Sequence, residues 1–179
     1  MTAGSKSLFA SLTAPKLPDS LFAVTDIDAE LSKVREAESD FIAADFSRLI
    51  CDSNDFSSLY FKNCLFKGNR FTACDFSKCT FIDCVFNGCD ISNCNFTESY
   101  FRACSFTSCK AVGAAFKDSY HKNVSFDGGS FELSDFQRSK LQSVLITDTD
   151  FSSALFSSCE IKKTELKNVT LARSVFFGT

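Results

Sequence analysis

The sequence is poor in residues on which active sites and loops depend. Its 179 residues include a single His, a single Met, two Pro, seven Gly and no Trp. The scattered Gly residues form no phosphate-binding loop, and no nucleophile or carboxylate pattern surrounds the one His. We therefore predict that the protein is not an enzyme, with no catalytic residue and no cofactor.

Long hydrophobic runs and a strong net charge are also absent. No apolar stretch approaches membrane-spanning length. The segment Ser7–Leu12, after Lys6, is too short and broken for a signal peptide. The net charge of −3 argues against strong nonspecific binding to nucleic acid. We expect a cytoplasmic or injected protein with reduced thiols.

The chain is rich in Phe, with 22 residues, and in Cys, with 10 residues. Of the 22 Phe, 19 fall on positions 41, 46, 51 and so on to 176, which we call the centres. Only Cys51, Ala111 and His121 are neither Phe nor aliphatic there. The remaining centres are Ile91, Leu141, Ile146, Ile161, Leu166 and Leu171. A bias of this kind indicates an internal repeat.

The position two residues before each centre is mostly small, and nine of the ten Cys lie there. Residues two apart point the same way on an extended segment. A five-residue period fits neither a helix nor a continuous strand, so it predicts a short strand and a corner, repeated. The nine residues are Cys64, Cys74, Cys79, Cys84, Cys89, Cys94, Cys104, Cys109 and Cys159.

This unit, as in Cys74-Asp75-Phe76-Ser77-Lys78, resembles the repeat of the pentapeptide-repeat family, and the register runs from 39 to 176 without a slip. The resemblance implies an all-β fold, a right-handed quadrilateral β-helix with four repeats in each coil. The centre and the small residue then point inward. About seven coils spaced by about 4.8 Å give a rod about 34 Å long.

Stacking explains why such a chain folds. One coil cannot bury its own Phe side chains, and the next coil covers them, so stability grows through nearest-neighbour interfaces. Each buried Phe contributes roughly 2–3 kcal/mol before entropy. The predicted structural core includes Phe66, Phe76, Phe81, Phe86, Phe96, Phe101, Phe106, Cys64, Cys84 and Cys104.

The cysteines allow three interpretations. Residues one coil apart stack, so Cys64, Cys84 and Cys104 form one inner ladder. The favoured interpretation is a small buried thiol that fills space beside Phe. A disulfide between coils fits the usual Cα spacing. A metal site is disfavoured because the four-residue gaps do not match zinc ligand pairs and Phe fills the centre, and we predict no metal.

Two centres depart from the pattern close together. We expect His121 to be buried and hydrogen-bonded, the alternative being a base or pH sensor. With Ala111 two repeats earlier, a locally underfilled core is predicted. A bend, a bound water or a distorted coil would each accommodate it.

The outer faces differ in charge. The face of centres 41, 61 and 81, here the basic-aromatic face, carries Tyr60, Lys62, Tyr100, Arg102, Tyr120, Lys122, Lys140, Lys162 and Lys163. The face of centres 56, 76 and 96, the acidic face, carries Asp55, Asp75, Glu98, Asp118 and Asp135. The face of centres 66 and 86, the stripe face, presents an apolar stripe of Leu65, Val85 and Leu145. Tyr and cations together suit an anionic partner, whereas mixed charges on a solvated face are the plain alternative.

Three segments follow from the register: an N-terminal arm (1–24) with Pro15 and Pro18, a capping helix (25–38) and the β-helix (39–179). Thr25 is the predicted N-cap, with Asp28 three residues on. One apolar face of the helix covers the first coil: Ile27, Leu31 and Val34. The other end reaches Phe176 without a helix. This favours a homodimer joined there or a missing downstream domain, with a frayed last turn as the alternative.

The resemblance also bears on function. As a stand-alone repeat protein of this size, the chain resembles the Qnr-type and immunity-type members of the family. Those proteins bind DNA gyrase or topoisomerase IV as DNA mimics and protect the enzyme from quinolones or peptide toxins. A near-neutral repeat segment and the absence of projecting loops depart from that pattern. The alternative is a generic protein-interaction scaffold or bacterial effector module. Direct nucleic-acid binding through the basic-aromatic face is a third, less favoured class.

Overall fold

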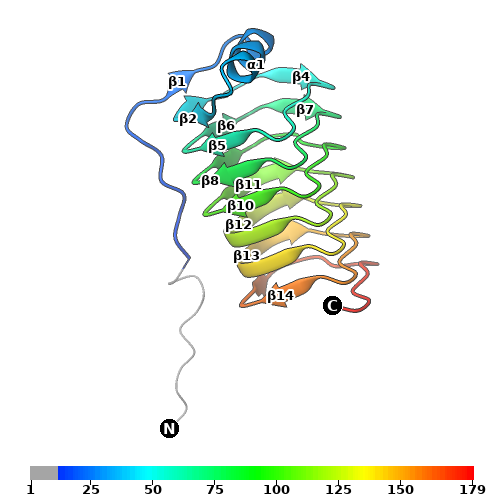
Figure 1. Cartoon of the computed structure of the whole chain (residues 1–179). Coiled ribbons are helices and arrows are strands. Elements are labelled where there is room, and N and C mark those ends of the chain that lie inside the picture. Colours follow the sequence, from blue (N-terminus) through cyan, green and yellow to red (C-terminus); the bar gives the residue numbers. More distant parts are fainter. Residues whose placement is uncertain (1–11) are drawn as a thin grey trace.

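The computed structural model describes residues 12–179. It shows a parallel β-solenoid of about seven turns with one short helix, and this confirms the predicted fold class. The coils stack into a rod with the helix at the N-terminal end (Figure 1). Successive coils pair in parallel and in register, so Phe66 lies beside Phe86 and Phe86 beside Phe106. Each residue therefore stands next to the residue twenty positions further on.

The four faces of the rod differ in their content of regular strand. The basic-aromatic face stacks β2 (Phe41–Ile42), β5 (Tyr60–Lys62), β8 (Thr80–Ile82), β10 (Tyr100–Arg102), the start of β12 (Tyr120–Ser130), the start of β13 (Lys140–Asp150) and β14 (Glu160–Lys162). The stripe face stacks β1 (Phe22–Ala23), β3 (Ala44–Asp45), β6 (Leu65–Lys67), β9 (Val85–Asn87), β11 (Ser105–Lys110), later parts of β12 and β13, and β15 (Glu165–Lys167).

The remaining two faces are held mainly by isolated bridges. The third face contains β4 (Ile50–Asp52) and β7 (Arg70–Thr72), single bridges from Arg70 to Lys110, the paired ends of β11, β12 and β13, and a last bridge from Asp150 to Thr170. The acidic face has bridges alone, from Asp55 to Val175. Tight turns between these short segments leave too few extended residues for a longer strand.

Stacked Phe rings fill the interior, as predicted. The rings of Phe66 and Phe86 lie 4.5 Å apart at 3°, and those of Phe86 and Phe106 lie 4.6 Å apart at 6°. Rings of neighbouring faces meet edge to face, the other favoured aromatic geometry. Every residue of the predicted structural core is buried, at 0 or 1% exposed.

The cysteines are free thiols, and each is buried. The Sγ of Cys89 donates to the carbonyl oxygen of Phe66 at 3.2 Å, and Cys94 reaches Phe71 in the same way at 3.3 Å. Ser99 makes the equivalent bond to Phe76 at 2.7 Å. The small position therefore supplies a hydrogen-bond donor as well as a small volume. Burial raises the pKa of Cys79 to about 12, so that thiol stays protonated near neutral pH.

Every corner of the solenoid uses a left-handed residue. The second residue after each centre has a positive φ throughout, from Ala43 at 52° to Gly178 at 69°. Most of these residues are not glycine, and a left-handed conformation costs them roughly 1–2 kcal/mol each. Hydrogen bonds between coils offset that cost, as where the Ser53 amide donates to the Thr72 carbonyl at 2.8 Å.

The N-terminal end is closed by helix α1 (Ile27–Glu36), whose Leu31 and Val34 are buried against the first coil. Its N-cap is Asp26, so the prediction of Thr25 was wrong. Thr25 directly follows Val24, which is held in extended backbone by a bond to the Asp45 carbonyl. Asp26 is then the residue whose carboxylate accepts the Ala29 amide, at 3.0 Å.

The predicted arm ends inside the sheet. Its β1 pairs with β3, and Val24 is buried in the place of a centre above Phe46. The last coil, by contrast, has open apolar centres: Ile161 is 37% exposed and Leu166 is 52% exposed. Among residues 12–179, no helix is long and apolar enough to cross a membrane.

The backbone departs from the regular repeat one coil after Ala111, at Gly129. Ala111 is buried. In the next coil, Gly129 pairs with Cys109, which lies two residues before Ala111. Gly129 has a φ of 98° at a small position, where a Cβ would come within 2.0 Å of the Cys109 carbonyl oxygen. A glycine is required there because the two backbones approach so closely.

Candidate binding surfaces

The basic-aromatic face brings its predicted residues into two neighbouring rows. Register pairing places Tyr100 beside Tyr120 and Arg102 beside Lys122. The two Tyr rings contact each other at 5.5 Å, and the Tyr120 hydroxyl donates to Gln142. Tyr60 stands apart, with Thr80 between it and Tyr100. The row of side chains after the centres contains Lys62, Ile82, Arg102, Lys122, Gln142 and Lys162.

The cations of this face divide into two groups. Within residues 12–179, Lys62, Arg102 and Lys122 form no ion pair, and all three are exposed. Lys140 and Lys162 both contact Glu160, Lys140 at 3.6 Å. The hydrogen bond from Lys162 lowers the pKa of Glu160. One half of the face thus keeps free positive charge, whereas in the other half Lys140 and Lys162 share one carboxylate.

The acidic face uses most of its carboxylates for its own structure. Asp55, Asp75 and Asp135 each accept the backbone amide two residues ahead, at 2.8, 2.8 and 2.9 Å. These contacts are Asx turns, which fix the corner after each short strand. The hydrogen bonding at Ser57 lowers the pKa of Asp55.

Ion pairs neutralise this face further. Arg138 binds Asp118 through two nitrogens, both at 2.7 Å. Lys117 lies 3.0 Å from Asp135, and Arg35 of α1 lies 3.3 Å from Asp55. In the described part of the chain, Asp75 and Glu98 are the predicted acidic residues without a charged partner. Sequence reasoning found the face but missed the pairing, although Asp118 and Arg138 are one coil apart.

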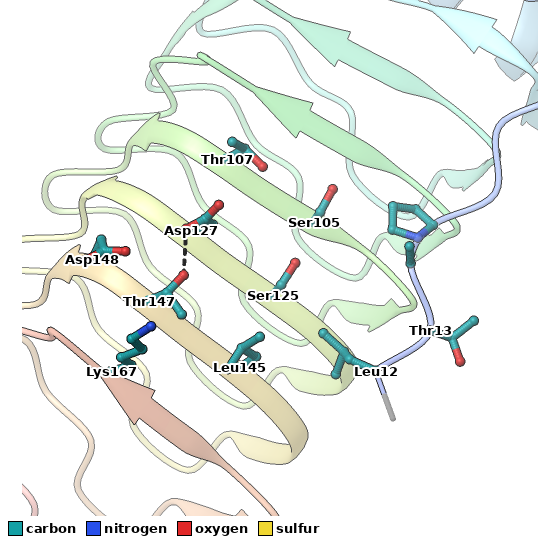
Figure 2. A pocket seen from close by; sticks show the side chains of 12 residues that line it. Leu12, Thr13, Ser105, Thr107, Ser125, Asp127, Leu145, Thr147, Asp148 and Lys167 are labelled. Atoms are coloured by element: carbon teal, nitrogen blue, oxygen red, sulfur yellow. Dashed lines mark hydrogen bonds between the residues drawn. The ribbon is translucent and has the colours of Figure 1, made fainter. Parts of the chain in front are cut away.

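The stripe face carries a groove of about 460 Å³ beside the arm (Figure 2). Its floor is polar, with Thr147 donating to Asp127 at 2.6 Å. The apolar stripe is interrupted here, because Leu145 is only 8% exposed and Leu12 of the arm points toward it. The prediction of an exposed Leu145 was therefore wrong, while Leu65 and Val85 are half-buried.

The arm itself is held along the corner between the basic-aromatic and stripe faces. The Asn123 side chain accepts the Thr13 amide at 3.0 Å and donates to the Thr13 carbonyl at 2.9 Å. Asp83 accepts the Lys16 amide at 3.2 Å, and Asn63 donates to the Lys16 carbonyl. Sequence reasoning missed this contact, although Asn and Asp at corner positions were visible.

The single His is a core residue. His121 is fully buried and stacks on Phe101 at 4.8 Å. Ser119 donates its hydroxyl to the Phe116 carbonyl at 2.6 Å, so its oxygen accepts from His121 Nε2 at 2.9 Å. The other ring nitrogen, Nδ1, has no hydrogen-bond partner among the described residues. Burial lowers the pKa of His121 to about 3, so the ring is neutral at pH 7.

Family comparisons agree with the repeat. The family model described as pentapeptide repeat region matches residues 54–131 and 79–150. The model described as pentapeptide repeats (8 copies) matches residues 134–172. No curated protein sequence matches the chain.

Several solved structures resemble the fold at low identity. Trypsin-treated QnrB1, a plasmid-mediated fluoroquinolone resistance protein, is 19% identical over 75% of this chain and 73% of its own, with a TM-score of 0.47. A pentapeptide repeat protein of the Arabidopsis thaliana thylakoid lumen is 21% identical over 50% and 66%, with a TM-score of 0.41. HetL, involved in heterocyst differentiation regulation in Nostoc sp. strain PCC 7120, is 7% identical over 84% and 92%, with a TM-score of 0.37.

Proposed function

Since the chain belongs to the pentapeptide-repeat family, we propose that it is a non-catalytic binding protein of the cytoplasm whose rod presents fixed rows of side chains to a protein partner. The observation that carries this proposal is the parallel register. It holds outward side chains in rows about 4.8 Å apart, on a core that buries nearly every Phe. A surface fixed in this way loses little conformational entropy when a partner binds.

The partner to test first is DNA gyrase or topoisomerase IV. In this proposal the acidic face takes the place of duplex DNA on the enzyme and protects it from quinolones or peptide toxins. Carboxylates recurring along one face support it: Asp55, Asp75, Glu98, Asp118 and Asp135. The resemblance of the Phe and Cys pattern to the Qnr-type proteins points to the same partner.

A supercoiling assay with purified gyrase, with and without a quinolone, tests this partner. The variant Glu98→Lys with Asp118→Lys reverses two charges of the acidic face and leaves its Asx turns intact. The matched control, Asp52→Lys with Glu132→Lys, makes the same charge change on the third face. We expect inhibition or protection by the wild type and the control, and its loss in the first variant. No effect of micromolar wild-type protein would reject the topoisomerase partner.

A generic interaction scaffold or effector module is the second candidate. It is favoured by the ion pairs of Asp55, Asp118 and Asp135, which leave the acidic face far less charged than DNA. Pull-downs from lysate with the wild type and with variants of each face would show which face a partner requires. A partner retained by every variant would argue against both charged faces.

The open last coil supports a homodimer as the assembly state. Its apolar centres line a hollow of about 110 Å³ with Phe176 and Leu171, and Ile161, Leu166 and Phe176 are partly exposed there. An identical end on a second copy offers both matching apolar surface and matching backbone groups. Light scattering after size exclusion tests this: we expect a dimer for the wild type and a monomer for Leu166→Lys. A monomeric wild type at every concentration would refute it.

A further inference from the structure

The basic-aromatic face offers free charge that the proposed topoisomerase contact does not use. We propose that its row from Lys62 to Lys162 is a docking surface for an extended acidic segment of a protein partner. This inference rests on the proposed function only in its general form, that the partner is a protein. It does not depend on the acidic face or on a topoisomerase.

Charge complementarity is the first argument. Arg102 and Lys122 are adjacent in the register, and neither has a carboxylate partner in residues 12–179. Like charges side by side repel across strands, so a bound carboxylate would relieve that repulsion. Other cations that form no ion pair within residues 12–179 are dispersed over the remaining faces, among them Lys67, Arg70 and Lys78.

Glu160 shows the contact that an incoming carboxylate would make. It lies between Lys140 of the preceding coil and Lys162, two residues ahead on the same strand, and contacts both. Lys122 and Arg102 stand on the same face two and three coils from Lys162, and the position of Glu160 is held beside them by Tyr120 and Tyr100 rather than by a carboxylate. Glu160 therefore shows that two cations of this face can share one carboxylate, whereas Arg102 and Lys122 have none among residues 12–179.

The spacing of the row fits an extended polypeptide. Lys62 and Lys162 are five coils apart, about 24 Å at about 4.8 Å for each coil. The four cations Lys62, Arg102, Lys122 and Lys162 lie two, one and two coils apart. Alternate side chains of an extended segment repeat every 6.6 Å or so, which brings a carboxylate within about 3 Å of each cation along the row. An acidic residue at every second position of the partner would stay within reach of each cation, because Lys and Arg side chains are long and flexible.

The arm demonstrates that this rod accepts extended chain along its axis. Asp83 and Asn123, two coils apart, hold Lys16 and Thr13, three residues apart. Two coils measure about 9.6 Å, and three extended residues span about 10 Å. The corner that holds the arm borders the basic-aromatic face, so a partner segment on that face would lie alongside the arm.

Nucleic acid fits this face less well. The rings of Tyr100 and Tyr120 already contact each other, and the Tyr120 hydroxyl is bound to Gln142. This arrangement leaves no slot for a base between the rings, which stacking on single strands would use. The net charge of −3 further opposes a phosphate backbone.

Fluorescence anisotropy tests the proposal with a labelled dodecapeptide of alternating Glu and Ser. The variant Lys62→Gln, Arg102→Gln, Lys122→Gln removes the free cations. The matched control Lys67→Gln, Arg70→Gln, Lys78→Gln makes the same charge change on other faces. We expect roughly tenfold weaker binding in the first variant and less than about twofold in the control, with weaker binding at higher salt. Equal thermal melts for both variants would show that each is folded.

Each remaining outcome overturns the proposal. Absence of peptide binding, or equal weakening by both triple variants, would remove the face as a docking surface. Tighter binding of a dodecathymidylate than of the peptide, lost in the first variant, would assign the face to nucleic acid instead. The Glu98→Lys, Asp118→Lys variant should keep peptide binding, so failure of the topoisomerase proposal and failure of this one are separate results.

Discussion

The two ends of the solenoid share one register but differ in how that register is filled and covered. Phe66 lies between Phe46 and Phe86, at 4.7 and 4.5 Å, and is fully buried. Leu166 holds the same place in the last coil and is 52% exposed. The difference arises from cover on the second side, because a coil is stabilised by its neighbours. The contribution of a repeat position to the free energy of unfolding is therefore not fixed by its place in the repeat. It depends on whether the next coil covers the side chain.

The largest expected effect is a direct test of that comparison. Phe86→Ala should cost about 3–5 kcal/mol of unfolding free energy, since the cavity would lie between two intact coils. Leu166→Ala should cost less than about 1 kcal/mol, because half of that side chain is already in water. Urea denaturation at a protein concentration low enough to keep the chain monomeric measures both. Equal losses would show that the last coil is covered in solution.

The second largest loss of stability is expected at Gly129, which lies between the two ends of the solenoid. Gly129→Ala should cost about 3 kcal/mol, because its Cβ would overlap the Cys109 backbone and its φ is 98°. Gly88→Ala is the matched control: its φ is 61° and nothing lies within 4 Å of the new Cβ. It should cost about 1 kcal/mol. Similar losses of stability for the two variants would mean that the backbones of Gly129 and Cys109 can move apart to admit a Cβ. The coils around Ala111 would then be less tightly packed than the structure shows.

Periodicity was enough to predict the fold because the same inward pair, small residue and Phe, recurs in the whole solenoid. It predicted the buried Phe66 and Cys84 and the buried His121. It could not predict Asp26 as the N-cap, since Thr25 and Asp26 are both good capping residues. The choice depends on Val24, which the sheet holds in place, and that is a tertiary effect.

The candidate surfaces were predictable in composition but not in charge. Residue identity places Asp118 on the acidic face, but only the stacked coils show that Arg138 takes up its charge. The arm was equally hidden, since Thr13 and Asn123 are 110 residues apart. Contacts of this kind carry no local period, so a repeat pattern says nothing about them.

The buried His121, in the middle of the solenoid, should make the stability of the protein depend on pH. His121 titrates at about 3 in the folded chain and near 6.5 when unfolded, so the unfolded state binds more protons below pH 6.5. Its contribution is fully present above pH 6.5 and is lost as pH falls toward 3. We expect about 2 kcal/mol less stability from this group at pH 5 than at pH 8.

His121→Phe checks that assignment. The substitution continues the ring stack on Phe101 and removes the unpartnered Nδ1, so the variant should lose this part of the acid destabilisation. Urea denaturation of both proteins at pH 8 and pH 5 gives the comparison. An unchanged pH slope would assign the acid sensitivity to the carboxylates of the Asx turns and ion pairs instead.

The smallest expected effect concerns the arm, the least buried part of the capped end. Asn123→Ala removes two hydrogen bonds to Thr13 and should release the arm by about 1 kcal/mol. Trypsin cleavage after Lys16 should then be roughly fivefold faster, because cleavage follows the open population. Asn93→Ala is the control, since Asn93 has the same left-handed corner, with a φ of 57°, on the third face. Faster cleavage in both variants would mean that the corner conformation, rather than the contact with Thr13, sets how firmly the arm is held.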